Sequence, residues 1–88
     1  MSYLQYLNDP SPENVRAVHE QSGATQPVIA QIAGIGLHTY KGWLTDPTNK
    51  HYRKPQNPTW NYLLYELEAR RLGFDNLQKF FENHGNNA

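Results

Sequence analysis

The chain has 88 residues, which suits one domain able to bury about 60–65% of the surface that its unfolded form exposes. Eight basic and eight acidic side chains cancel, and the absence of cysteine excludes disulfides, a thiolate nucleophile and a cysteine-ligated zinc finger. Because no apolar run approaches the roughly 20 residues that span a bilayer and residues 1–7 lack a secretion signal, we expect a small cytoplasmic protein, not an enzyme.

A cluster of helix-breaking residues at positions 8–12 predicts the start of the first helix. Ser11 provides a capping side chain, and Pro12 fits the first helical position because its missing N–H would be unpaired there. The amphipathic pattern that follows ends at Gly23. The apolar side chains of residues 3–7 pack either on the same core or on a partner subunit, and the sequence leaves both arrangements open.

Two further short helices are predicted over residues 25–34 and 37–44. The first begins at a capping threonine and ends at Gly34. It is too short to be stable alone, so it requires tertiary packing. In the second helix, Tyr40 and either Trp43 or Leu44 are expected to face inward.

A polar loop at residues 45–57 separates these helices from two more within residues 58–84. The longer one has a sustained apolar pattern from Trp60 to Leu72. The sequence contains no alternating run of β-branched residues, so no strand is predicted. We therefore expect residues 1–88 to form a single all-α domain, a compact five-helix bundle.

The last helix is predicted to carry one apolar face. Asp75 is expected to cap this helix, and the face consists of Leu77, Phe80 and Phe81. The face can fold back onto the preceding helix. Exposed aromatic patches usually mark association, so we expect the same residues also to form a homodimer contact.

Charge is unevenly distributed although the total is zero. Residues 1–37 carry a formal charge of −2, residues 38–54 carry +3, and residues 55–88 carry −1. A local basic stretch on a neutral chain suits a polyanion bound to one face. The alternative is a solvated loop with ordinary lysines.

Residues 25–43 combine two short helices with a tight glycine turn, the features of a helix-turn-helix. Ala30 must be small so that the two helices can cross closely, and Gly34 permits a positive φ at the turn. Because aromatic residues pack the second helix onto the first, the opposite face is exposed, and we expect it to include Leu37, His38, Lys41 and Gly42.

This stretch resembles the Cro and phage-repressor type of helix-turn-helix, also called Xre-like. The family pattern is met at each spacing by Thr25, Gln26, Ala30, Gly34, Gly36 and Trp43. The resemblance covers about residues 12–72, and the basic loop with the helix after it looks most similar to small phage and mobile-element regulators, including anti-CRISPR-associated repressors. It implies a lambda-repressor-like fold and a homodimeric transcriptional repressor that binds a palindromic operator in double-stranded DNA without a cofactor.

The resemblance also implies a set of DNA-binding residues: Thr25, Gln26, Leu37, His38, Lys41, Lys50, Arg53 and Lys54. Gln26 would contact phosphate at the start of the first motif helix, with the free backbone N–H groups there. The second motif helix would present its side chains to base edges in the major groove. The loop cations would hold the flanking backbone. The family commonly has a polar residue at the position of Leu37, so this difference affects which bases would be recognised rather than the fold.

Other chemistry has little support in the sequence. The four histidines (His19, His38, His51 and His84) lack metal-ligand spacing, so no metal site is predicted. Glu66 and Glu68 do not share a helix face, so no paired-carboxylate site is expected. Trp43 and Trp60 are interpreted as core residues rather than ligand platforms.

A second function remains open beside DNA binding. Leu37, Gly42 and the zero net charge favour a protein-interaction module of the same fold that does not read DNA, such as an antitoxin-like or phage inhibitor protein. A protein partner that survives nuclease treatment would distinguish the two.

Overall fold

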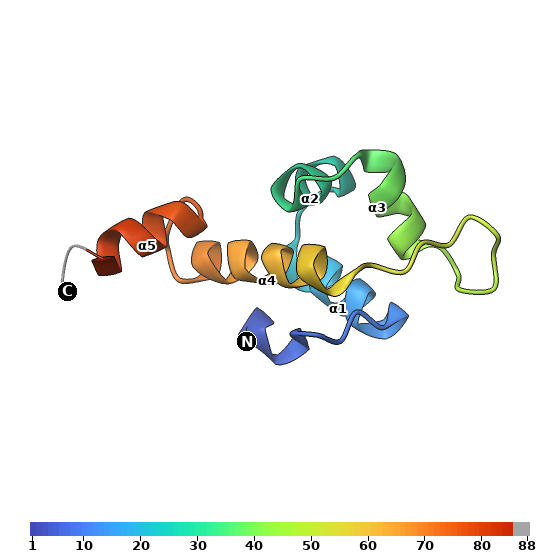
Figure 1. The fold of residues 1–88 in the computed structure, drawn as a ribbon, viewed down its shortest axis with the longest axis horizontal. Helices are drawn as coiled ribbons and strands as arrows, with labels where there is room; N and C mark the ends of the chain where they lie inside the picture. Colours follow the sequence, from blue (N-terminus) through green and yellow to red (C-terminus); the bar gives the residue numbers. More distant parts are fainter. Residues whose placement is uncertain (86–88) are drawn as a thin grey trace.

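In the computed structural model, which describes residues 1–85, the chain is helical without strands, so the all-α prediction is confirmed for that part. A 3-10 helix, η1 (Tyr3–Tyr6), precedes five α-helices: α1 (Pro12–Ser22), α2 (Gln26–Ala33), α3 (Leu37–Leu44), α4 (Asn57–Arg71) and α5 (Leu77–Gly85). The molecule extends over 48 × 22 × 22 Å, with α3 toward one end and α5 at the other (Figure 1).

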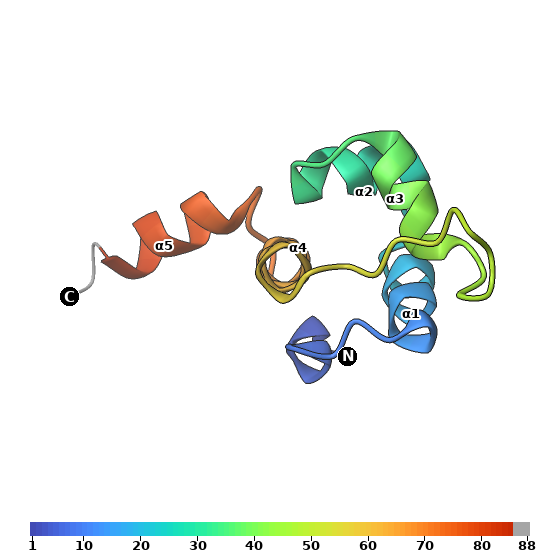
Figure 2. The same ribbon diagram turned by 45° about the vertical axis from the view of Figure 1, so that its right-hand side comes forward.

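Helix α4 is the centre of the fold. Figure 2 looks nearly along its axis and shows α1, α2 and α3 on one side and α5 on the other. Trp60, Leu63 and Leu64 of α4 are almost completely buried, which confirms Trp60 as a core residue. The buried cluster also draws residues from η1, α1, α2 and α3, whereas none of residues 77–83 of α5 belongs to it. Helix α5 therefore packs on the end of α4 and leaves the core to the other helices.

The N-terminal segment packs mainly on its own chain, the first of the two arrangements left open by the sequence, although Leu4 is 39% exposed. The indole Nε1 of Trp60 donates a hydrogen bond to the carbonyl oxygen of Tyr6 at 2.8 Å. Asn61 holds the turn at Asn8, accepting from its backbone N–H and donating to its side-chain oxygen, each at 2.8 Å. Tyr3 is buried against the same core.

The helix ends follow the predicted signals with one exception among the first three helices. The Ser11 Oγ accepts a hydrogen bond from the Asn14 N–H at 3.2 Å, as a capping residue should. Gly23 and Gly34 end α1 and α2 with φ of +65° and +75°, in the left-handed region. Thr25 occupies the N-cap position of α2, but its side chain makes no capping hydrogen bond.

One prediction for the C-terminal helices was wrong. The cap of α5 is Asn76, not Asp75, because the Asn76 Oδ1 accepts from the Lys79 N–H at 2.8 Å. The Leu77 N–H is bound instead by the Glu66 carboxylate at 2.7 Å, so α4 itself supplies part of the cap. At the other helix boundary, α4 ends at Arg71, Leu72 is its C-cap and is 50% exposed, and the predicted stop Gly73 has a φ of +98°.

Glu66 and Glu68 are both only 8% exposed, and each has its own set of partners. The Glu68 carboxylate binds the Arg71 guanidinium at 2.7 and 2.9 Å, the Tyr3 N–H at 2.9 Å and the Ser2 hydroxyl at 3.0 Å. The hydrogen bonds from Arg71 lower the pKa of Glu68 most, and together with the N-terminal donors they hold it at about 2 against the opposing effect of burial. Glu68 therefore ties the N-terminal segment to α4.

We expect the free energy of unfolding to fall as the pH is lowered from about 5 to about 2. Because the pKa of Glu68 is lower in the folded state, the unfolded state binds the proton first, and the stabilisation is complete only above the unfolded pKa. The loss should reach about 2–3 kcal/mol at 1.36 kcal/mol per pKa unit. The free energy of unfolding, measured with urea at each pH in this range, should depend more steeply on pH in the wild type than in Glu68→Gln. Replacement of the exposed Glu82, as Glu82→Gln, is the control. Parallel profiles for wild type and Glu68→Gln would contradict the assignment.

Candidate nucleic-acid interface

Helix α3 is fixed from behind by aromatic residues. Tyr40 and Trp43 are buried, and their rings meet edge to face with centroids 5.7 Å apart. Trp43 contacts Trp60 of α4 in the same way at 6.4 Å. The Tyr40 hydroxyl forms a 2.9 Å hydrogen bond with the His19 Nδ1 of α1, and burial raises the pKa of this tyrosine, so the hydroxyl stays protonated. The inward orientation predicted for Tyr40 and Trp43 is confirmed.

The opposite side of α3 faces solvent. His38, Thr39 and Lys41 are exposed, and Leu37, the first helical residue, is half-buried. Thr39 is absent from the predicted set, although its place between two outward residues on a helix with Tyr40 inside could have identified it. Together these side chains offer an imidazole, a hydroxyl and an ammonium group, all suited to hydrogen bonds with base edges or phosphates.

Gly42 does not belong to the exposed face, contrary to prediction. It is buried because the chain returns across it after the loop, and the Arg53 N–H donates to the Gly42 carbonyl oxygen at 3.0 Å. A Cβ atom at this position would lie 2.8 Å from the Arg53 Cγ and 3.2 Å from the His51 carbonyl oxygen. The glycine thus accommodates a neighbouring segment rather than leaving a bare patch on α3.

The segment of residues 45–56, here called the basic loop, is organised by its own side chains. The Asp46 carboxylate accepts from the Thr48 N–H at 2.8 Å and from its hydroxyl at 2.7 Å. The Asn49 Oδ1 accepts from the His51 N–H at 2.8 Å. The hydrogen bonds from Thr48 lower the pKa of Asp46, with a smaller contribution from the Arg16 cation of α1. The loop therefore consists of two turns, each closed by its own hydrogen bonds.

The structure brings one loop cation, Arg53, against α3 and directs another, Lys54, elsewhere. Arg53 lies against Gly42, the residue that follows Lys41, and its Nη1 donates to the carbonyl oxygens of Lys50 at 3.4 Å and Tyr52 at 3.1 Å. Lys50 is exposed within the loop. Lys54 instead lines a hollow of about 470 Å³ with residues 8–12 at the start of α1, so it faces a different part of the surface.

The start of α2 carries the remaining predicted residues. Thr25 is exposed, and Gln26, the first helical residue, is half-buried. The Thr25 carbonyl accepts from the Ile29 N–H at 3.1 Å. Because Pro27 has no N–H, the first turn of α2 leaves the N–H groups of Gln26 and Val28 for other partners. A helix N-terminus of this kind suits an anion.

The predicted apolar face of α5 is only partly buried. Leu77 and Phe80 are half-buried, whereas Phe81 is 61% exposed. Phe80 packs edge to face on Phe74 with centroids 5.3 Å apart. Beside Phe81 lies an almost wholly apolar groove of about 240 Å³, whose lining includes Leu4, Tyr65, Ala69 and Leu72.

Comparisons of the chain with protein-family models, curated proteins and solved structures returned no match. Within residues 1–85 no helix is long and apolar enough to cross a membrane. Over the same part of the chain, no three histidine, aspartate or glutamate side chains gather where they could hold a metal ion, and the His84 side chain lies outside the described residues.

Proposed function

We propose that the chain is a sequence-specific DNA-binding transcriptional regulator of the lambda-repressor-like helix-turn-helix type, a repressor that acts as a homodimer on a palindromic operator. One observation carries the proposal. Helix α3 presents His38, Thr39 and Lys41 outward, while Tyr40 and Trp43 fix it from behind. A short, rigidly held helix with hydrogen-bonding side chains on its free face suits the major groove.

The proposed contacts fall into two classes. His38, Thr39 and Lys41 read base edges, and Leu37 lies where it can touch a thymine methyl group. Gln26 with the free first-turn N–H groups of α2, and Lys50 and Arg53 of the basic loop, hold phosphates on either side. Because the net charge is zero, non-specific affinity is modest, so base contacts carry a large share of the discrimination.

Gel-shift titration tests this division, using duplexes from the DNA upstream of the chain's own coding sequence and random duplexes of equal length. Lys41→Ala should weaken the preferred duplex by about 1–3 kcal/mol and change random DNA little, because Lys41 reads bases. Arg53→Ala should weaken both classes about equally and reduce the salt slope by about 1, because Arg53 binds phosphate.

The wild type at low salt is the reference for both variants, and circular dichroism shows that each remains folded. Equal losses on preferred and random DNA for Lys41→Ala would reject the base-reading role of α3. The absence of any retarded band for the wild type at low salt would reject DNA binding altogether.

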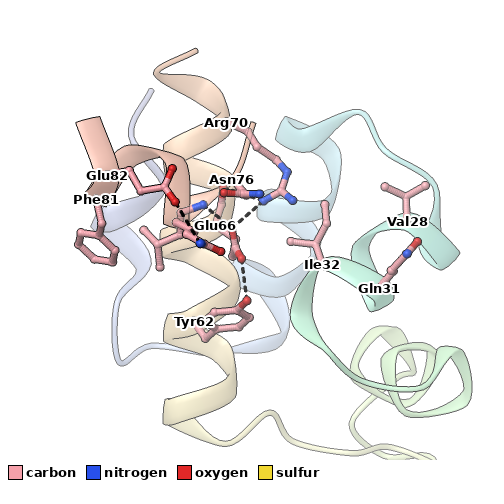
Figure 3. A pocket seen from close by; sticks show the side chains of 11 residues that line it. Val28, Gln31, Ile32, Tyr62, Glu66, Arg70, Asn76, Phe81 and Glu82 are labelled. Atoms are coloured by element: carbon pink, nitrogen blue, oxygen red, sulfur yellow. Dashed lines mark hydrogen bonds and ion pairs between the residues drawn. The ribbon is translucent and has the colours of Figure 1, made fainter. Parts of the chain in front are cut away.

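A protein-interaction module of the same fold is the second candidate, and a cleft between α2 and the α4–α5 junction favours it. The cleft measures about 850 Å³, and Figure 3 shows Val28 and Ile32 on one wall with Tyr62 and Phe81 across from them. Val28 and Tyr62 are 45% and 43% exposed, and exposed large side chains gathered around one cleft often mark a contact with another protein. A protein partner that stays bound after nuclease treatment, together with no DNA shift at low salt, would favour this candidate.

A further inference from the structure

The contact between Gly42 and Arg53 joins α3 to the basic loop at one point. The Arg53 N–H donates a hydrogen bond to the Gly42 carbonyl oxygen at an N–O distance of 3.0 Å. The Cβ and Cγ atoms of Arg53 fill the space that a side chain at position 42 would need. The Gly42 carbonyl also accepts from the Thr45 N–H at 3.3 Å, so the end of α3 and the return of the loop share one acceptor. The stem of Arg53 is therefore fixed relative to Lys41.

The guanidinium of Arg53 is also oriented. Its Nη1 atom donates to two backbone carbonyl oxygens of the loop, those of Lys50 and Tyr52. Both hydrogen bonds involve this one nitrogen, so among the described residues the edge formed by Nε and Nη2 keeps its donors for another molecule. Two parallel N–H groups on one edge match two oxygens of a phosphate. Arg53 is exposed, so a phosphate can reach this edge.

We propose that Gly42 and Arg53 form a preorganised clamp for one backbone phosphate of duplex DNA, in which Arg53 binds the phosphate through two hydrogen bonds and Gly42 is the positioning residue. The clamp rests on the proposed function and adds a geometric requirement to it. A loop cation whose only role is charge can be exchanged for another cation. An oriented arginine fork cannot be replaced by lysine.

The docking of the loop is tested first in the free protein by amide hydrogen exchange. The Arg53 N–H should exchange slowly in the wild type and become at least about 10-fold faster in Gly42→Ala, because the new Cβ displaces the loop. Gly36→Ala is the matched control, since its φ is −70° and no atom lies within 4 Å of its added Cβ. Unchanged exchange at Arg53 in Gly42→Ala would overturn the positioning role of Gly42.

The clamp is tested by DNA binding of Arg53→Lys, which keeps the charge and the Cβ and Cγ atoms that pack on Gly42. We expect Arg53→Lys to lower the affinity for all duplexes by about 10-fold and to leave the salt slope unchanged, because the fork is lost while the charge remains. Lys79→Arg on α5, outside the proposed interface, is the control, and it should bind as the wild type does. Gly42→Ala should lose affinity on preferred and random DNA alike.

Two negative results have different meanings. If the wild type shifts DNA and Arg53→Lys binds equally well, the clamp is overturned and the proposed function stands. If the wild type shifts no duplex at low salt, the proposed function fails and the clamp fails with it.

Discussion

Replacement of Trp60 by alanine is expected to lower the free energy of unfolding by about 3–5 kcal/mol, the range typical of a fully buried aromatic residue. Trp60 has no exposed surface, contacts Trp43 behind α3, and binds the Tyr6 carbonyl at the N-terminus. Its loss leaves a cavity where α4, α3 and the N-terminal segment meet. Because a domain of this size has a stability of only about 5–15 kcal/mol, the variant should lie close to unfolding at physiological temperature.

Urea unfolding followed by circular dichroism measures this effect, with Trp60→Phe as the matched control. Phenylalanine keeps an aromatic ring in the core but cannot donate the hydrogen bond to Tyr6, so it should lose less than half as much stability. The exposed residue Glu20 of α1 provides a second comparison, since Glu20→Ala should be nearly neutral. A loss below about 1 kcal/mol for Trp60→Ala would contradict the central position of Trp60 in the core.

The helices could be predicted from the sequence because their signals are local. Ser11 before Pro12 and the glycine at position 34 act within one turn of the helix that they begin or end, so neighbouring residues suffice to identify them. The cap of α5 depends partly on Glu66, eleven residues before Leu77. A contact of that kind follows from how α5 meets α4, and no local pattern contains it.

The same distinction applies to the candidate interface. The outward positions of His38 and Lys41 follow from the spacing of Tyr40 and Trp43 on one helix, which the sequence displays. The role of Gly42 depends on a loop that returns eleven residues later, so the sequence indicated only a missing side chain. Lys54 illustrates a related limit. It lines a hollow beside the start of α1 while its neighbour Arg53 lies against α3, and a count of charges in the loop does not separate the two.

Replacement of Phe81 by aspartate is expected to convert the proposed homodimer to a monomer and to weaken binding to a palindromic duplex by about 10²–10⁴-fold, because the two half-sites then bind independently. Phe81 is 61% exposed and borders the apolar groove that includes Leu4, Tyr65 and Leu72, the surface we assign to the partner subunit. A carboxylate placed in such a contact would lose its hydration without gaining a partner. The monomer itself should keep its stability, since the side chain contributes nothing to the buried core.

Sedimentation equilibrium without DNA measures the oligomeric state, and gel shifts on one and two half-sites measure the consequence. Lys79→Gln is the matched control, because it changes the net charge of α5 by the same amount at an exposed ion pair with Glu82. It should remain dimeric and bind both duplexes as the wild type does. A wild type that sediments as a monomer at high micromolar concentration would exclude the dimer contact. If Phe81→Asp stays dimeric, the contact lies on another surface, and α3 would then be paired by a different two-fold axis.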